Sequence, residues 1–338
     1  MRVARLHEIG KPLQIDDVPV PEVSGDEVLI RIAGAGVCHT DVHIRSGEFP
    51  VPPTTQWPLA LGHENAGHVE AIGPEVSGLA KGDPVMVWGA QGCGRCRHCR
   101  GGHEPVCDMS LWIAGGGYAE YMLLPASRLA ARLDGIDPVE AAPLADAGLT
   151  PYRAIKRALP YLYPGGAAVL IGIGGLGHLA IQILRALAPG TQILAVDVND
   201  DRLALALELG ADCAIDGRGD AIGEITQLTS GEGASAVFDL VGSEATLRTA
   251  TAAVARRGIL VQVGIGGGTV PLSFFSARPE AMITSSFWGS YTELEELLAL
   301  AAQGRVRTEV TRRPLEDVNE VLDMLERGEV SGRVVLVP

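Results

Sequence analysis

A glycine-rich turn between an apolar run and a helical segment constrains the fold of this chain more than any other feature. The apolar run Ala167–Gly172 leads directly into the sequence Gly172-Ile173-Gly174-Gly175-Leu176-Gly177. In such a turn the first glycine permits the tight bend, Gly174 lets the backbone approach a pyrophosphate, and Gly177 lets helix and strand pack closely. The helix N-terminus then faces the phosphates. This arrangement is typical of a dinucleotide-binding βαβ unit.

The end of the next apolar run predicts which dinucleotide is bound. That run ends in Asp197, twenty residues after Gly177. A carboxylate there can accept hydrogen bonds from the adenine-ribose hydroxyls and would repel a 2′-phosphate. The next residues, Val198 and Asn199, offer no arginine to bind that phosphate. The sequence therefore predicts NAD as the cofactor.

Apolar runs of strand length alternate with helical segments from about residue 147 to residue 287. The helical segments include Gly175–Leu187 and Asp200–Leu209. Six strands with helical crossovers predict a parallel, doubly wound sheet, and apolar character on both faces fits buried parallel strands. The predicted strands are Ala167–Gly172, Gln192–Asp197, Cys213–Asp216, Ala236–Leu240, Gly258–Gly264 and Met282–Ser286.

The remainder of the chain has a different character. Residues 1 to about 145 contain short runs rich in Val, Ile and Leu, separated by Gly, Pro and Asp, and are mostly β. Two helices follow residue 287, at Thr292–Gln303 and Leu315–Arg327, and a last strand, Gly332–Val337, is expected to return to the first domain. A length of 338 residues also suggests two domains. We expect residues 1–146 and 288–338 to form one domain, into which residues 147–287 are inserted. The early runs are Arg2–His7, Leu13–Val18, Glu27–Ala33, Ala66–Ile72, Asp83–Trp88 and Tyr118–Pro125.

Charge and hydropathy exclude several classes of partner. The formal net charge of −14 argues against a nucleic-acid or anionic membrane partner. No run approaches the roughly 20 apolar residues of a membrane span. The first residues lack the apolar core of a secretory signal, so we expect a cytoplasmic protein.

Four of the six cysteines lie within fifteen positions. In a long chain without a signal peptide, such clustering indicates metal rather than disulfides. Four thiolates from one loop suit a closed tetrahedral zinc site, so we predict a structural zinc lobe over about residues 92–108. A reactive or disulfide-forming cluster is one alternative, and a nucleic-acid-binding zinc ribbon, disfavoured by the acidic chain, is another. The four residues are Cys93, Cys96, Cys99 and Cys107.

Two other segments contain metal-binding side chains. They read Cys38-His39-Thr40-Asp41-Val42-His43 and Gly62-His63-Glu64. A catalytic zinc needs three protein ligands and an open position. Cys38 and His63 are natural candidates for two of the ligands.

The chain resembles, from end to end, the zinc-containing medium-chain alcohol dehydrogenase family of bacterial and archaeal type. The resemblance implies an α/β protein with a GroES-like β catalytic domain carrying two zinc ions, and a Rossmann domain carrying NAD. It implies hydride transfer between a primary or secondary alcohol, or the corresponding aldehyde or ketone, and NAD. It also implies a homotetramer, with a dimer as the alternative. The motifs that carry it are Gly36-Val37-Cys38-His39-Thr40-Asp41, Gly62-His63-Glu64, the Cys93–Cys107 lobe, Ala142-Pro143-Leu144, Ala147-Gly148-Leu149-Thr150 and the glycine turn before Asp197.

The resemblance assigns roles to individual residues. Cys38 and His63 match ligands of the catalytic zinc, Glu64 a nearby acid that can approach the metal, and Asp41 a carboxylate that orients the ligand histidine. Thr40 and His43 match a proton relay. Trp88 and Trp288 are the best candidates for apolar walls of the substrate pocket. The expected cofactor contacts are His39 and Arg333 at the pyrophosphate, Arg202 beside the adenosine ribose, and Thr150, Gly172, Gly174, Gly175, Leu176, Gly177 and Asp197.

One position departs from the family pattern. Where most of the family has a cysteine as third zinc ligand, this chain has Asp146. A carboxylate oxygen is a legitimate zinc donor. The alternative is that Asp146 only caps a helix beginning near Ala147. We favour the ligand, because Cys38 and His63 would otherwise have to recruit Glu64.

Three other functions are alternatives to this one. A zinc-dependent polyol or threonine dehydrogenase of the same superfamily would need more polar groups in its pocket, and the aromatic candidates favour apolar alcohols. The ligand set disfavours a metal-free reductase. The Thr40–His43 relay disfavours a non-catalytic protein that binds NAD and zinc.

Overall fold

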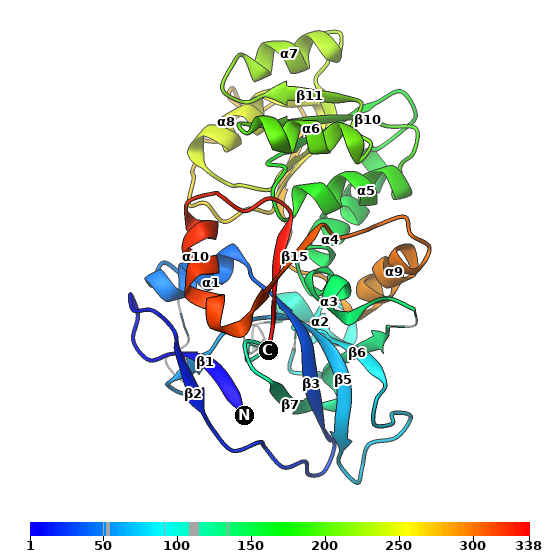
Figure 1. The fold of residues 1–338 in the computed structure, drawn as a ribbon. Coiled ribbons are helices and arrows are strands. Elements are labelled where there is room, and N and C mark those ends of the chain that lie inside the picture. The colour runs from blue at the N-terminus through cyan, green and yellow to red at the C-terminus, as the bar shows by residue number, and fades with distance from the viewer. Residues whose placement is uncertain (50, 52–54, 91, 108–114, 134) are drawn as a thin grey trace. The chain divides into compact units, whose positions relative to one another are not determined.

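The computed structural model describes residues 1–49, 51, 55–90, 92–107, 115–133 and 135–338. The chain divides into two compact units (Figure 1). Unit 1 contains Met1–Leu149, Gly289–Gly304 and Thr308–Pro338, and unit 2 contains Thr150–Trp288 and Arg305–Arg307. The sequence analysis predicted the two domain boundaries between residues 146 and 147 and between residues 287 and 288. Within the described residues, no helix is long and apolar enough to cross a membrane.

Unit 2 is built on a parallel sheet. Within the described residues it has six strands in the order β11-β10-β9-β12-β13-β14, and neighbouring strands in this order pair in parallel. This confirms the doubly wound sheet predicted from the sequence. The order reverses between β9 and β12, which is where sheets of this kind bind ligands at their carboxyl ends. The strands are β9 (Ala167–Ile171), β10 (Gln192–Asp197), β11 (Cys213–Asp216), β12 (Ala234–Asp239), β13 (Val254–Gln262) and β14 (Met282–Ser285).

Helices precede or connect strands of this sheet, and several of them begin at a capping side chain. The Asn199 side chain accepts a hydrogen bond from the backbone of Arg202 at the start of α6, and Ser243 caps α8 in the same way. Capping of this kind satisfies backbone N–H groups that the first turn leaves without partners. The helices are α4 (Leu149–Ala158), α5 (Gly177–Leu187), α6 (Asp200–Glu208), α7 (Ala221–Leu228) and α8 (Glu244–Ala253).

Unit 1 is mostly β, and β3 (Glu27–Gly36) is central to it. This strand pairs antiparallel with β5, β7 and β16. Its buried residues Val28, Ile30 and Ile32 belong to an apolar core that includes Val318, Val321 and Leu322 of α10. The sheet order is β15-β16-β3-β5-β6-β8, and β1, β2 and β4 form a second, small sheet. The other strands are β1 (Arg2–Leu6), β2 (Gln14–Asp17), β4 (Leu59–Ala60), β5 (Glu64–Ile72), β6 (Pro84–Val87), β7 (Tyr121–Pro125), β8 (Leu129–Arg132), β15 (Val310–Pro314) and β16 (Arg333–Val337).

Several elements of unit 1 were not predicted. α1 (His39–Ser46) and β15 are two of these. β15 has no apolar alternation and is mostly exposed, so it is defined by its parallel pairing with β16. The expected helix at Leu315 begins with a 3₁₀ turn, and α10 itself starts at Val318. The remaining helices are α2 (Arg97–Arg100), α3 (Pro138–Ala141), α9 (Tyr291–Ala302) and α10 (Val318–Glu326).

Candidate active site and metal centres

The four cysteines of the lobe converge on one point. Their sulfur atoms all lie within 4.8 Å of one another. The Sγ of Cys96 is 3.5 Å from that of Cys99 and 3.7 Å from that of Cys107. A tetrahedral zinc with Zn–S bonds of 2.3 Å separates its sulfur ligands by about 3.8 Å. The cluster therefore fits a zinc ion with four thiolate ligands.

Backbone amides point at these sulfurs. The N–H groups of Arg95 and Cys96 lower the pKa of Cys93 to about 6. Burial and the neighbouring thiols have the opposite effect on Cys99 and raise its pKa to about 12. Four thiolates this close repel one another unless a cation lies between them. A cation bound among the four sulfurs would therefore stabilise all four as thiolates.

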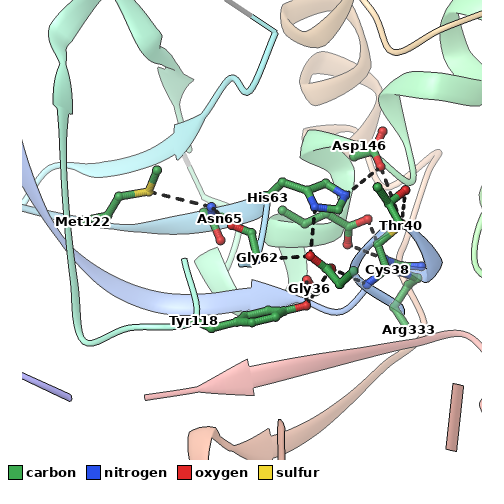
Figure 2. Close-up of polar contacts among 12 residues, drawn as sticks. Gly36, Cys38, Thr40, Gly62, His63, Asn65, Tyr118, Met122, Asp146 and Arg333 are labelled. Carbon is green, nitrogen blue, oxygen red and sulfur yellow. Dashed lines mark hydrogen bonds and ion pairs between the residues drawn. The ribbon is translucent and has the colours of Figure 1, made fainter. Parts of the chain in front are cut away.

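A second group of potential ligands lies in unit 1, and Figure 2 shows most of it. Cys38 directly precedes α1, His63 and Glu64 stand at the start of β5, and Asp146 follows the 3₁₀ turn Ala142–Ala145. The Oδ2 of Asp146 is 3.3 Å from the Nε2 of His63 and 3.8 Å from the Sγ of Cys38. One ligand atom from each of these four residues lies within 4.8 Å of the others. Three donors at these spacings fit a zinc site with an open position.

Asp41 ties two of these segments together. Its Oδ2 accepts a hydrogen bond from the N–H of Cys38, and its Oδ1 accepts one from the N–H of Gly62. Gly62 has a φ of 85°, a conformation that favours glycine. Asp41 Oδ1 also lies 3.5 Å from His63 Nδ1, so the other ring nitrogen faces Asp146. This is the contact expected of a carboxylate that orients a ligand histidine.

Asp41 and His63 each favour the charged form of the other. Burial raises the pKa of Asp41, but His63 and Tyr118 outweigh it and hold the pKa below its usual value. Burial lowers the pKa of His63, but Asp41 and Asp146 outweigh it and hold the pKa well above its usual value. Asp41 is therefore ionised beside His63.

Glu64 is bound by Arg333. The Nη2 of Arg333 is 2.5 Å from both carboxylate oxygens of Glu64, and both side chains are buried. Burial outweighs the attraction of Arg333 and raises the pKa of Glu64 to about 7. β3 ends in glycine here, because a Cβ at Gly36 would lie 2.1 Å from Glu64 Oε2. The guanidinium expected at a pyrophosphate is thus held beside the candidate metal ligands.

The proposed relay residues lie on α1. The Oγ1 of Thr40 is 3.7 Å from the Sγ of Cys38. The Nδ1 of His43 is 2.6 Å from Glu48 Oε2. The exposed ring of His39 is 6.1 Å from the ring of His43. Thr40 is therefore beside the candidate metal ligands, and His43 is bonded to an exposed carboxylate.

The glycine turn of unit 2 has the sterics expected of a dinucleotide site. Gly172 has a φ of 92°. A Cβ at Gly177 would lie 2.2 Å from the Gly172 carbonyl oxygen, so the close packing of helix on strand requires glycine. At Gly174 a Cβ would meet only Arg202 Nη1, at 3.9 Å. The turn is thus open at Gly174, with Arg202 beside it. The other expected contacts are Gly175, Leu176 at the N-cap of α5 and buried Thr150 on α4.

Asp197 has a structural role that the sequence analysis did not predict, and its contact with the adenine ribose stays a prediction. Its Oδ2 accepts a hydrogen bond of 2.6 Å from the N–H of Ile173, inside the glycine turn. Its Oδ1 accepts bonds of 2.8 Å and 3.0 Å from the N–H groups of Val198 and Asn199. The carboxylate therefore joins the end of β10 to the glycine turn.

The two tryptophans expected at the substrate pocket are both buried. Trp88 donates from Nε1 to the Gly289 carbonyl at 3.1 Å and meets the Tyr291 ring edge-on at 5.9 Å. Trp288 stands edge-on to Phe287 with ring centres 6.3 Å apart. The pocket role of both residues stays a prediction.

Two polar side chains in this region escaped the sequence analysis. The Tyr118 hydroxyl donates to Asp41 Oδ2 at 2.8 Å. The carboxylate of Glu48, which the sequence analysis did not single out, lies 2.6 Å from the Nδ1 of His43. Both contacts depend on how distant or looped segments fold back, and no spacing rule indicates them.

Comparison with known proteins follows the same division. Residues 24–134 match the alcohol dehydrogenase GroES-like domain, and residues 175–303 match the zinc-binding dehydrogenase model. An NAD-dependent alcohol dehydrogenase of Sulfurisphaera tokodaii is 41% identical, with all of both chains covered. A D-arabinose 1-dehydrogenase (NADP(+)) of Saccharolobus solfataricus is 39% identical, covering 100% of this chain and 97% of that protein.

The crystal structure of the alcohol dehydrogenase from Aeropyrum pernix superimposes with a TM-score of 0.93 at 42% identity, and all of both chains is covered. Full-length similarity to enzymes at this level removes the alternative of a non-catalytic protein. The chain therefore belongs to the zinc-containing medium-chain alcohol dehydrogenase family and is an NAD- and zinc-dependent oxidoreductase.

Proposed function

We propose that the enzyme interconverts apolar primary or secondary alcohols and their aldehydes or ketones, with Cys38, His63 and Asp146 holding the catalytic zinc. The observation that supports this ligand set is that Asp146 Oδ2 lies 3.3 Å from the Nε2 of His63 and 3.8 Å from the Sγ of Cys38. The lobe formed by Cys93, Cys96, Cys99 and Cys107 holds the structural zinc. Bound at these residues, zinc supplies a Lewis acid for the substrate oxygen, and NAD supplies the hydride acceptor.

Asp146 is a better third ligand than Glu64. Both carboxylate oxygens of Glu64 are bonded to Arg333. The carboxylate of Asp146 instead points at His63 and Cys38. Binding a metal through Glu64 would take it from a buried cation, which costs energy because that charge is then left uncompensated. This supports Asp146 over Glu64 as the third ligand.

The remaining polar residues move the proton and hold the site in shape. Thr40 lies beside Cys38, where its hydroxyl can accept the proton of a substrate hydroxyl while it gives up its own proton to the next member of the relay. His43, on the same helix, passes the proton toward solvent, where Glu48 holds its Nδ1. Asp41 keeps the His63 ring in one orientation. His39 and Arg333 at the pyrophosphate stay a prediction, and Arg333 also neutralises Glu64.

A sugar or polyol substrate is the second candidate. It is favoured by the relative named D-arabinose 1-dehydrogenase (NADP(+)), which is 39% identical. Trp88 and Trp288 as pocket walls favour apolar alcohols instead. The carboxylate of Asp197 beside the glycine turn also argues for NAD rather than NADP.

Assembly into a homotetramer, with a dimer as the alternative, belongs to the same proposal. In unit 2, Phe274 and Phe275 are 92% and 95% exposed, and the edge strand β14 exposes Met282 and Ile283. Large apolar side chains and an open strand edge favour association, and a second copy of the chain can cover both through a two-fold axis. Light scattering should report a tetramer or dimer, and a monomer at working concentration would refute the proposal. The cytoplasmic location also stays a prediction.

The substrate class is tested with a panel of primary, secondary and cyclic alcohols, D-arabinose, a polyol and threonine. Each is assayed with NAD and with NADP, before and after chelation, alongside metal analysis. We expect the highest kcat/KM with an apolar alcohol and NAD. We also expect this activity to be lost when chelation removes one zinc per chain. Higher kcat/KM with D-arabinose or threonine would overturn the substrate assignment. Full activity after loss of the labile zinc would overturn the ligand set.

A further inference from the structure

A buried hydrogen-bonded chain runs from Tyr118 through Asp41 to His63 (Figure 2). The Tyr118 hydroxyl is 2.8 Å from Asp41 Oδ2. The other oxygen of Asp41 is 3.5 Å from His63 Nδ1, and the far side of the same ring faces Asp146. All three side chains of the chain are buried. The Tyr118 hydroxyl, which lies outside the segments that carry the candidate ligands, is therefore connected to His63 through Asp41.

The Asp41 carboxylate is held from four sides. Cys38 N–H and the Tyr118 hydroxyl donate to Oδ2, while Gly62 N–H donates to Oδ1, next to His63 Nδ1. Three of these contacts come from residues in or beside the segments that carry the candidate ligands. The fourth comes from Tyr118, 77 positions away from Asp41 in the sequence. Tyr118 thus connects the Asp41 carboxylate to a segment of unit 1 that is distant in the sequence.

The direction of the hydrogen bond follows from the chemistry of the two groups. A phenol hydroxyl can donate, whereas a carboxylate can only accept, and the two oxygens are 2.8 Å apart. The phenol therefore donates to the carboxylate, a charge-assisted bond that is stronger than one between neutral groups.

The tyrosine itself is fixed on both sides. Its ring packs against Gly62, where a Cβ would lie 2.4 Å from Tyr118 Cδ1. Its N–H donates to the Leu61 carbonyl at 3.2 Å, and its carbonyl accepts from the Ala4 N–H at 2.8 Å. The hydroxyl is therefore preorganised, and it cannot follow Asp41 if the carboxylate rotates.

We propose that Tyr118 is a positioning residue of the catalytic zinc site. By fixing Asp41, it would keep the proton of His63 on Nδ1, beside Asp41, and leave Nε2, which faces Asp146, available to bind zinc. The inference rests on the proposed ligands but not on the identity of the substrate. Without the hydroxyl, Asp41 loses one of its four contacts and the His63 ring is less restrained. Outer partners of ligand histidines typically change metal affinity 10- to 100-fold, and we expect about tenfold here because Tyr118 acts through Asp41.

The test is Tyr118→Phe, which removes the hydroxyl and leaves the ring that packs on Gly62. The matched control is Tyr121→Phe, which removes the same group from half-buried Tyr121 on β7. Zinc release to a chromogenic chelator is followed in the intact enzyme, where the four-cysteine lobe serves as an internal reference. A second readout is the visible spectrum of enzyme whose catalytic site is loaded with Co²⁺, which reports the geometry of the ligands. Thermal unfolding is recorded for each variant.

We expect Tyr118→Phe to release the first zinc about ten times faster and to alter the Co²⁺ spectrum. Tyr121→Phe and the slow zinc of the lobe should be unchanged. Wild-type release rate and spectrum in Tyr118→Phe would overturn the inference and leave the proposed function standing. Equal acceleration at both zinc sites, with a lowered unfolding temperature, would also overturn it, because that result describes a packing role. A wild-type enzyme with only one zinc per chain would overturn both proposals.

Discussion

Replacing Asp197 should change two properties that can be measured separately, the stability of the protein and its choice between NAD and NADP. The carboxylate is buried and accepts hydrogen bonds from the N–H groups of Ile173, Val198 and Asn199. Asp197→Gly leaves all three donors without this acceptor, whereas Asp197→Asn keeps one oxygen that can still accept.

The stability cost follows from these contacts. At about 1 kcal/mol for each bond, after water enters the space left by the side chain, Asp197→Gly should lose about 3 kcal/mol. Asp197→Asn should lose about half of that. For a chain of this length, 3 kcal/mol corresponds to a decrease of about 4 °C in the unfolding temperature. Urea unfolding without cofactor measures the loss directly.

The effect on cofactor choice comes from charge. A carboxylate about 4 Å from a 2′-phosphate costs roughly 1 to 4 kcal/mol, depending on the effective dielectric constant. Removing it should narrow the preference for NAD over NADP by about 5- to 900-fold, because every 1.4 kcal/mol is a factor of ten. Arg202, whose Nη1 lies beside Gly174, would then favour the phosphate, so Arg202→Leu in the Asp197→Gly background should reverse the gain.

Asp200→Asn is the matched control. Asp200 follows the same strand, but its side chain is 76% exposed and pairs with Arg218 at the surface. Such pairs contribute less than about 1 kcal/mol, so stability and cofactor ratio should hardly change. A wild-type preference for NADP in kcat/KM would refute the reasoning. So would a folded Asp197→Gly variant with an unchanged ratio.

Three further outcomes are expected. Asp146→Asn should reduce kcat about a hundredfold and weaken zinc binding, because the amide carries no negative charge. Asp146→Cys should retain zinc. Normal zinc content and turnover in Asp146→Asn would make Glu64 the third ligand. A chelator should first remove the catalytic zinc, with loss of activity, and should leave the zinc of the four-cysteine lobe in place. Metal analysis that finds one zinc per chain in fully active protein would contradict this. Gly177→Ala should weaken NAD binding, since its Cβ would lie 2.2 Å from the Gly172 carbonyl oxygen and displace α5; calorimetry that gives the wild-type Kd would show that the helix can adjust.

The amino-acid sequence by itself determined the parts of this protein that depend on neighbours in the chain. The run from Ala167 through the glycine turn to Asp197 predicted β9, α5 and β10, because periodicity and turn chemistry act over a few residues. The four-cysteine lobe could be read in the same way, since all of its sulfurs come from one loop. Where the local pattern was weak, as in polar β15, the sequence predicted nothing.

Only the tertiary structure decided which distant residues meet. Cys38 and Asp146 are 108 positions apart, and Glu64 and Arg333 are 269 apart. Family resemblance supplied their expected roles, but it did not predict that Arg333 would hold Glu64 or that Tyr118 would reach Asp41. Those contacts depend on the register of β3 against β5 and β16 and on the burial of charges that must then find partners. Register and burial are properties of the whole packed unit, so no short segment of the sequence contains them.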